Sequence, residues 1–120
     1  MVEVPERYNA SMVLDHNVDV GRAGKVAIFC GDDQLTYGHL LTRVCRFADA
    51  LRRLGVRRED RVVMVLNDTP AFPTVFYGAQ RIGAVPVPSN PLLRWEDHHY
   101  FIADSYARAV VADAEHLEKV

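Results

Sequence analysis

The feature that most constrains the fold of this chain is an unbroken apolar run, "RVVMVL", at residues 61–66. A strand with one face in water alternates apolar and polar residues, and this run shows no such alternation after Arg61. It therefore predicts a strand that is buried on both faces, which is typical of the centre of a parallel sheet. Because parallel strands need long crossover connections, the run also predicts helices on either side of it in the sequence.

The segments around this run have the periodicity of helices. Over residues 38–54 apolar residues recur at steps of three and four, which places them on one stripe, and Gly55 follows as the helix stop. The stripe consists of Leu40, Leu41, Val44, Phe47, Ala48, Leu51 and Leu54. After the run, "NDTPAF" supplies Asp68 or Thr69 as a cap, and this second helix is expected to end at Gly83.

The rest of the chain continues the alternation. Further helices are expected at 8–21, 94–105 and 114–120, and further strands at 25–30, 35–37, 84–87 and 107–113. The turn residues "GDDQ" between the first two strands predict a hairpin. The sequence therefore predicts an α/β fold: a short hairpin followed by a doubly wound, mostly parallel sheet with flanking helices and right-handed crossovers.

Two prolines interrupt the strand that follows the second helix. Pro86 and Pro88 are two residues apart, so both missing N–H donors lie on one edge of the strand, while Val85 and Val87 direct theirs to the other. Such a strand can form a full ladder on one side only, so we expect it to be short or peripheral. The loop after it is either a rigid turn that only closes the fold or part of a ligand site, because ligands bind at the carboxyl ends of strands in open α/β sheets.

Length, charge and cysteine content exclude several classes of protein. A chain of 120 residues has room for one domain, and a net charge of -2 argues against a nucleic-acid partner. There is no apolar stretch of membrane-spanning length, so no membrane partner is expected, and the acidic opening "MVEVPERYNA" lacks the apolar core of a secretory signal. Cys30 and Cys45 are expected to be small buried side chains in a reducing compartment, which favours the cytoplasm.

Motifs that carry chemistry are sparse. "WEDHHYF", at 95–101, holds two carboxylates and two histidines, but His98 and His99 are neighbours that diverge on a helix, so we expect solvated helix surface and no metal site. The sequence has neither a Gly-x-Ser-x-Gly motif nor a glycine-rich phosphate loop. "LNDTP" leads from a strand into a helix, which suits an anion, yet without glycine it is interpreted as ordinary capping. From its residues alone, the chain contains no complete active site.

Longer stretches resemble a known family. "LTYGHL" before the long helix, and "RIGAVPVPSNPLL" after the helix that follows the buried strand, are similar to the start of the large domain of the adenylate-forming enzymes. That superfamily contains acyl- and aryl-CoA synthetases, peptide-synthetase adenylation domains and luciferases. Together with "YNASMVLDHNV" and "NDTPAF", the sequence from about Tyr8 to the end most resembles the benzoate-CoA ligase group.

The resemblance implies an enzyme that uses ATP, Mg and coenzyme A. ATP and an aromatic carboxylic acid would form an acyl-adenylate with loss of pyrophosphate, and the CoA thiolate would then take the acyl group. In some members the residue that matches Arg81 is basic and lies near the CoA nucleotide, where a guanidinium can pair with phosphate. Arg81 is therefore the one candidate cofactor-binding residue, although the helix dipole alone also favours arginine at a helix C-terminus.

The resemblance also sets an expectation for the extent of the domain. In such enzymes the phosphate loop, the acid pocket and the catalytic lysine lie downstream of the matching region, so no catalytic or metal-binding residue is assigned. We expect residues 1–120 to be a partial N-terminal domain, truncated at its C-terminal end, that is inactive alone. An exposed apolar face and an open sheet edge would promote self-association.

A second hypothesis remains from the residues themselves. The chain would be a self-contained binding module, flavodoxin-like or receiver-like, that uses the carboxyl end of its sheet. The sequence favours this less, because "VLND" offers a receiver only Asp68 and "FCGDD" is not the hydroxyl-rich loop of a flavodoxin.

Overall fold

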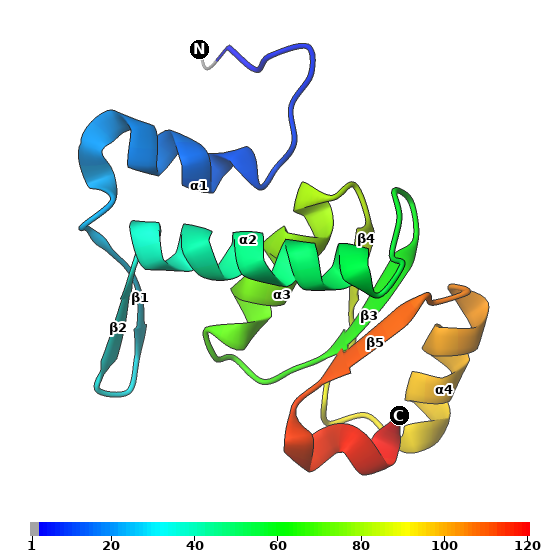
Figure 1. The fold of residues 1–120 in the computed structure, drawn as a ribbon. Helices are drawn as coiled ribbons and strands as arrows, with labels where there is room; N and C mark the ends of the chain where they lie inside the picture. The colour runs from blue at the N-terminus through cyan, green and yellow to red at the C-terminus, as the bar shows by residue number, and fades with distance from the viewer. Residues whose placement is uncertain (1–2) are drawn as a thin grey trace.

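The computed structural model describes residues 3–120, so the first two residues of the opening segment, where no secretory signal was expected, lie outside it. A two-stranded antiparallel hairpin and a three-stranded parallel sheet form the framework (Figure 1). The elements in chain order are α1 (Met12–Asn17), η1 (Val18–Arg22), β1 (Val26–Cys30), β2 (Asp33–Thr36), α2 (Tyr37–Arg53), β3 (Arg61–Val65), α3 (Ala71–Arg81), β4 (Val85–Pro88), α4 (Trp95–Asp104), β5 (Ala109–Ala112) and η2 (Ala114–Lys119). Among these residues no helix combines the length and apolar character that a membrane crossing requires.

The apolar run of the sequence is the central strand of the sheet, as predicted. The strand order is β4-β3-β5, and both neighbours run parallel to β3. The side chains of Val62, Val63, Met64 and Val65 are completely buried. The lack of alternation in this run is explained by burial on both faces, because a strand in this position has no side in contact with water.

The prolines place β4 at the edge of the sheet, which confirms the expectation from their spacing. The N–H of Val85 donates to the carbonyl of Asp60 at 2.8 Å, and the N–H of Ser89 donates to Met64 at 2.8 Å. Both donors face β3, while Pro86 and Pro88 occupy the alternate positions that face away from it. The prolines therefore remove no hydrogen bond between β4 and β3.

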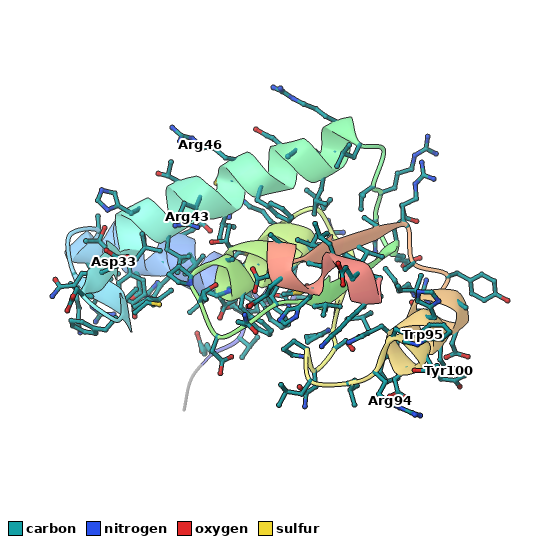
Figure 2. The ribbon with its side chains drawn as sticks, turned by 90° about the horizontal axis from the view of Figure 1, so that it is seen from below. Asp33, Arg43, Arg46, Arg94, Trp95 and Tyr100 are labelled. Carbon is teal, nitrogen blue, oxygen red and sulfur yellow. The ribbon has the colours of Figure 1, made fainter. Side chains whose placement is uncertain are left out.

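The order of the strands makes the sheet doubly wound. From β3 the chain passes through α3 to β4 on one side, and from β4 it passes through α4 to β5 on the other side of β3. Figures 1 and 2 show α2 and α3 together on one face of the sheet and α4 on the opposite face. The loops that leave the adjacent strands β3 and β4 therefore run to opposite faces of the sheet.

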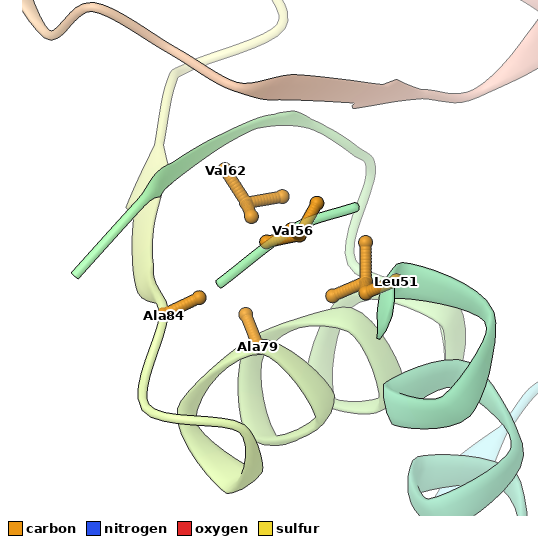
Figure 3. Close-up of a cluster of buried hydrophobic side chains, with 5 residues drawn as sticks. All are labelled: Leu51, Val56, Val62, Ala79 and Ala84. Atoms are coloured by element: carbon orange, nitrogen blue, oxygen red, sulfur yellow. The ribbon is translucent and has the colours of Figure 1, made fainter. Parts of the chain in front are cut away.

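The main core joins this sheet to the two long helices. One cluster consists of Leu51, Val56, Val62, Ala79 and Ala84, drawn in Figure 3. Helix α2 begins where the side chain of Thr36 accepts a hydrogen bond from the N–H of His39 at 3.2 Å. It packs along α3 at Gly78, where an added Cβ would lie 2.8 Å from Cδ1 of Phe47.

Several local predictions need correction. The first helix is shorter than expected, because α1 passes into the wide turn η1, in which Gly21 has a φ of 87°. Strand β2 starts at Asp33, and Tyr37 already belongs to α2. The last segment, η2, is a 3-10 helix. The thiols of Cys30 and Cys45 are free, but both residues are partly exposed rather than buried.

Candidate functional site

The most evident candidate site is a crevice at the carboxyl ends of β3 and β4. Its walls are the two loops that leave these strands for opposite faces, and it has a volume of about 460 Å³. It is lined by Leu66, Asn67, Asp68, Phe72, Pro88, Ser89, Asn90, Pro91 and Leu92. In doubly wound sheets, ligands bind in the crevice between strands whose following connections diverge in this way. The loop after Pro88, which the sequence left open between a rigid turn and part of a ligand site, forms one wall of this crevice.

One wall of the crevice is held to the neighbouring strand by Asn67. The N–H of Asn67 donates to Oδ2 of Asp113 at 2.8 Å, and its side-chain amide donates to Glu115. The amide oxygen of Asn67 lies 3.0 Å from Nε2 of His116. Because Asn67 follows β3 and Asp113 follows β5, this network ties together the carboxyl ends of two parallel strands.

The same network contains a cluster of groups that could hold a metal ion. The nearest ligand atoms of Asp113, Glu115 and His116 lie within 4.8 Å of one another. All three side chains are already hydrogen-bonded to Asn67, which accounts for their proximity. Sequence reasoning missed this cluster, although a signal existed: Asp113, Glu115 and His116 lie within four residues directly after the strand predicted around residue 110.

The other wall of the crevice is held by a buried histidine, which corrects one expectation. His98 was expected on a solvated helix surface, but its side chain is completely buried. Its Nδ1 lies 2.9 Å from Oγ of Ser89, a residue that is itself only 6% exposed. The periodicity of α4 carries the missed signal, because His98 is three and four residues before Phe101 and Ile102 on the apolar side.

The pair of Ser89 and His98 does not have the arrangement of a nucleophile and its base. Nε2 of His98 is buried and has no hydrogen-bond partner among the described residues, so no carboxylate orients the imidazole. Burial lowers the pKa of His98, and the charge of Lys119 lowers it further. The imidazole is therefore held in its neutral form, and the pair is a fixed polar contact inside the protein.

His99 lies apart from this contact. Its ring packs edge-on against the ring of Trp95, with the centroids 5.1 Å apart. Trp95 and Tyr100 project outward from α4, as does Arg94 at its start, and Figure 2 shows them at the surface. The two neighbouring histidines of "WEDHHYF" therefore lie in different surroundings: His98 is in the interior and His99 is on the surface.

Arg81, the candidate cofactor-binding residue, lies outside the crevice. It is the last residue of α3, and its guanidinium donates two hydrogen bonds to the carboxylate of Asp15, at 2.7 and 2.9 Å. The hydrogen bonds from Arg81 hold the pKa of Asp15 below its ordinary value. The pair fastens α1 to the end of α3 and lines a separate surface hollow with Asn9, Ser11, Met12 and Arg52.

Comparison with known proteins defines the class to which this fold belongs. The sequence profile described as AMP-binding enzyme matches residues 14–120, and the chain belongs to this family. The match confirms the resemblance to adenylate-forming enzymes, and the flavodoxin-like or receiver-like alternative is not favoured.

Among the curated relatives are two ligases of aromatic acids. The chain is 43% identical to the 4-hydroxybenzoate–CoA/benzoate–CoA ligase of Rhodopseudomonas palustris, over 92% of this chain and 21% of that protein. It is 40% identical to the benzoate–CoA ligase of Thauera aromatica, over 97% of this chain and 22% of that protein. The chain thus spans about a fifth of the length of these relatives.

Solved structures give the same fold. A benzoate CoA ligase from Burkholderia xenovorans LB400 superposes with a TM-score of 0.89 at 41% identity, covering 95% of this chain and 23% of that one. An anthranilate CoA ligase in complex with anthranoyl-AMP superposes with a TM-score of 0.93 at 32% identity, covering 98% of this chain and 22% of that one. The hairpin and the doubly wound sheet are therefore the first part of the adenylate-forming fold, as predicted.

Proposed function

We propose that residues 1–120 form the partial N-terminal domain of an ATP-dependent aryl-acid–CoA ligase. The observation that carries the proposal is the identity of 40–43% to ligases named for benzoate and 4-hydroxybenzoate, over nearly the whole chain. A carboxylate is a poor electrophile. Attack of its oxygen on the α-phosphate of ATP, with loss of pyrophosphate, would give its carbonyl carbon AMP as a good leaving group. The CoA thiolate can then displace AMP and form the thioester.

The described residues support this chemistry by providing a packed frame and a crevice at the carboxyl ends of β3 and β4. Within residues 3–120 we find no arrangement of nucleophile and base, and the crevice has polar groups only on its two loops. The reacting groups are therefore expected from other parts of such an enzyme. The chain alone should not turn over substrate.

The proposed reaction needs cofactors, and the described residues can be tested for groups that would hold them. ATP and coenzyme A are required by the reaction, and Mg would offset the phosphate charge during adenylate formation. The cluster of Asp113, Glu115 and His116 does not fit Mg well, because its atoms already bond Asn67 and one of its three groups is an imidazole. We assign no Mg ligand in this chain.

An activity assay tests the proposed function. The protein from the complete reading frame that contains residues 1–120, and the 120-residue chain itself, are each given ATP, CoA and either benzoate, 4-hydroxybenzoate or hexanoate. We expect the former to release AMP with an aromatic acid and much less with hexanoate, and the latter to release none. AMP formation by the 120-residue chain alone would refute the partial-domain proposal, and a preference for hexanoate would refute the aromatic substrate.

Arg81 is proposed to bind a CoA phosphate in the same enzyme, which requires it to exchange Asp15 for the phosphate. Both side chains are about 30% exposed, at 29% and 32%, so a phosphate can reach the pair. Arg81→Gln should raise the KM for CoA several-fold without changing the exchange of pyrophosphate into ATP, which needs no CoA. Arg46→Gln, an exposed arginine on α2, is the control. An unchanged KM for CoA in Arg81→Gln would leave the ion pair with Asp15 as the only role of this residue.

Self-association and a cytoplasmic location complete the proposal. Strand β5 pairs only with β3 among the described residues, and the apolar side chains of Leu92, Tyr106 and Leu117 are more than half exposed, at 86%, 89% and 60%. An open edge and scattered apolar groups favour pairing between copies. Sedimentation of the 120-residue chain should show a mass that rises with concentration, and a strict monomer would oppose this. The free thiols of Cys30 and Cys45 suit a reducing compartment.

A further inference from the structure

Apart from the backbone hydrogen bond from the N–H of Ser89 to Met64, the loop over residues 89–93, which forms one wall of the crevice, is attached to the rest of the protein by two side-chain contacts. Ser89 Oγ lies 2.9 Å from Nδ1 of His98 on α4, and the carbonyl of Pro91 accepts a hydrogen bond from Nζ of Lys119 on η2 at 2.8 Å. Within the loop, Asn90 accepts hydrogen bonds from the N–H groups of Leu92 and Leu93, at 2.9 and 3.1 Å. The loop is therefore shaped locally but positioned by His98 and Lys119.

The surroundings of His98 disfavour a proton on its ring. The residue is completely buried and makes its one side-chain hydrogen bond to Ser89, and Nε2 has no partner among residues 3–120. Two basic residues of η2, Lys119 and His116, act on it, and both oppose a positive charge there. Asp97, its neighbour on α4, and the backbone of Leu93 act in the opposite direction but more weakly than burial and Lys119. A protonated His98 would place a cation in the interior close to the cation that holds Pro91.

We propose that His98 is a pH-sensitive latch that positions the 89–93 wall of the crevice while its imidazole is neutral and releases that wall when the imidazole is protonated. Protonation adds one hydrogen to the ring, from solvent, and makes both ring nitrogens donors. The completely buried ring then carries a positive charge, and this charge repels Lys119. Exposure of His98 to water relieves both costs, and this movement requires α4 and the 89–93 loop to separate.

The direction of the pH dependence follows from the lowered pKa. A histidine titrates at about 6.5 when the loop is open and at a lower pH when it is closed. The open state therefore binds more protons, so the closed state is fully favoured above pH 6.5 and loses stability as the pH falls below this value. The equilibrium constant for closing the loop falls by at most about tenfold per pH unit, because opening takes up one proton.

Amide hydrogen exchange and NMR titration of the 120-residue chain test the latch without reference to any enzymatic activity. Between pH 7.5 and 5.0, after correction for the intrinsic exchange rate, protection of the Ser89 and Leu93 amides should fall, by up to about tenfold per pH unit. His98→Asn keeps a polar group near the position of Nδ1 but cannot titrate, and should abolish this pH dependence. His99→Asn changes the exposed neighbour on the same helix and should retain it.

The ring resonances of His98 in the unmodified chain provide a measurement that does not depend on how the variants fold. They should titrate below 6.5, in step with the loss of protection at Ser89. Titration of His98 at or above 6.5 would overturn the proposal. So would a pH dependence of the Ser89 and Leu93 amides that is the same in His98→Asn as in the unmodified chain.

Discussion

The parallel sheet and the N-terminal hairpin of this chain differ in how their strands are buried. Four consecutive side chains of β3 are fully enclosed, and the strand is flanked by neighbours on both sides. In β1 and β2 no residue is fully buried, and Phe29 is 72% exposed. Both regions are hydrogen-bonded β-structure, although the register of the hairpin shifts between Val26 and Ile28. The difference shows that most of the stability should reside in the sheet and its helices, while the hairpin contributes only partly buried side chains such as Ile28 and Leu35 to a second cluster.

Replacement of Met64 is the strongest test of this difference. Met64→Ala removes a completely buried side chain from the central strand, and we expect a loss of about 2–5 kcal/mol in the free energy of unfolding. Urea denaturation followed by circular dichroism measures it. A loss below about 1 kcal/mol would mean that the sheet does not hold the main core.

The contact between α2 and α3 comes next. A Cβ at Gly78 would lie 2.8 Å from Phe47 and 3.4 Å from the carbonyl of Val44, so Gly78→Ala must displace packed atoms. Overpacking costs about 1–3 kcal/mol, against a gain of about 1 kcal/mol from helix propensity, so we expect a net loss of about 1 kcal/mol. Gly24→Ala is the control, because nothing lies within 4 Å of its new Cβ. Equal unfolding midpoints for the two variants would contradict a tight helix contact.

The ion pair that fastens α1 is expected to have an intermediate effect. Asp15→Asn should cost about 1 kcal/mol at neutral pH, because a bidentate and partly buried contact with Arg81 is weakened. Since Arg81 lowers the pKa of Asp15, the contribution is complete above the ordinary aspartate pKa of about 3.9 and is lost as the pH falls through the lower folded value. The unfolding free energies of the original chain and the variant should therefore converge in acid. Asp19→Asn, which changes an exposed carboxylate, is the control and should leave the free energy of unfolding at neutral pH unchanged.

The smallest effect is expected in the hairpin. Phe29→Ala removes the largest side chain of β1 from an exposed position, so the free energy of unfolding should change by less than about 0.5 kcal/mol. Thermal and urea unfolding both measure it. A loss comparable to that of Met64→Ala would show that the hairpin is buried in solution, most directly by a second copy of the chain.

The sequence predicted the sheet better than the site. The run at 61–66 and the two prolines were sufficient to place β3 at the centre and β4 at the edge, because these patterns reflect burial and missing donors that act locally. The position of His98 could not be derived in the same way, since Glu96, Asp97 and His99 around it are typical of a surface. Only the helical spacing of three and four residues from His98 to Phe101 and Ile102 indicated that its side chain faces the interior.

The contacts of Asn67 and Arg81 were beyond sequence reasoning for a different reason. Asn67 is 46 residues from Asp113, and Arg81 is 66 residues from Asp15, so each contact depends on how distant elements pack. A helix C-terminus explains an arginine without any partner, and a turn explains an asparagine. Local patterns therefore predicted the secondary structure in which Asn67 and Arg81 lie, but not the residues that they contact.

The prolines of β4 also determine the electrostatic character of the outer side of the sheet. On that side the strand presents the carbonyl oxygens of Pro86 and Pro88 with no N–H group between them. This border carries only partial negative charge, so it attracts water and cationic side chains and offers another strand no matching donors. The outer edge of β4 is therefore expected to remain in contact with water.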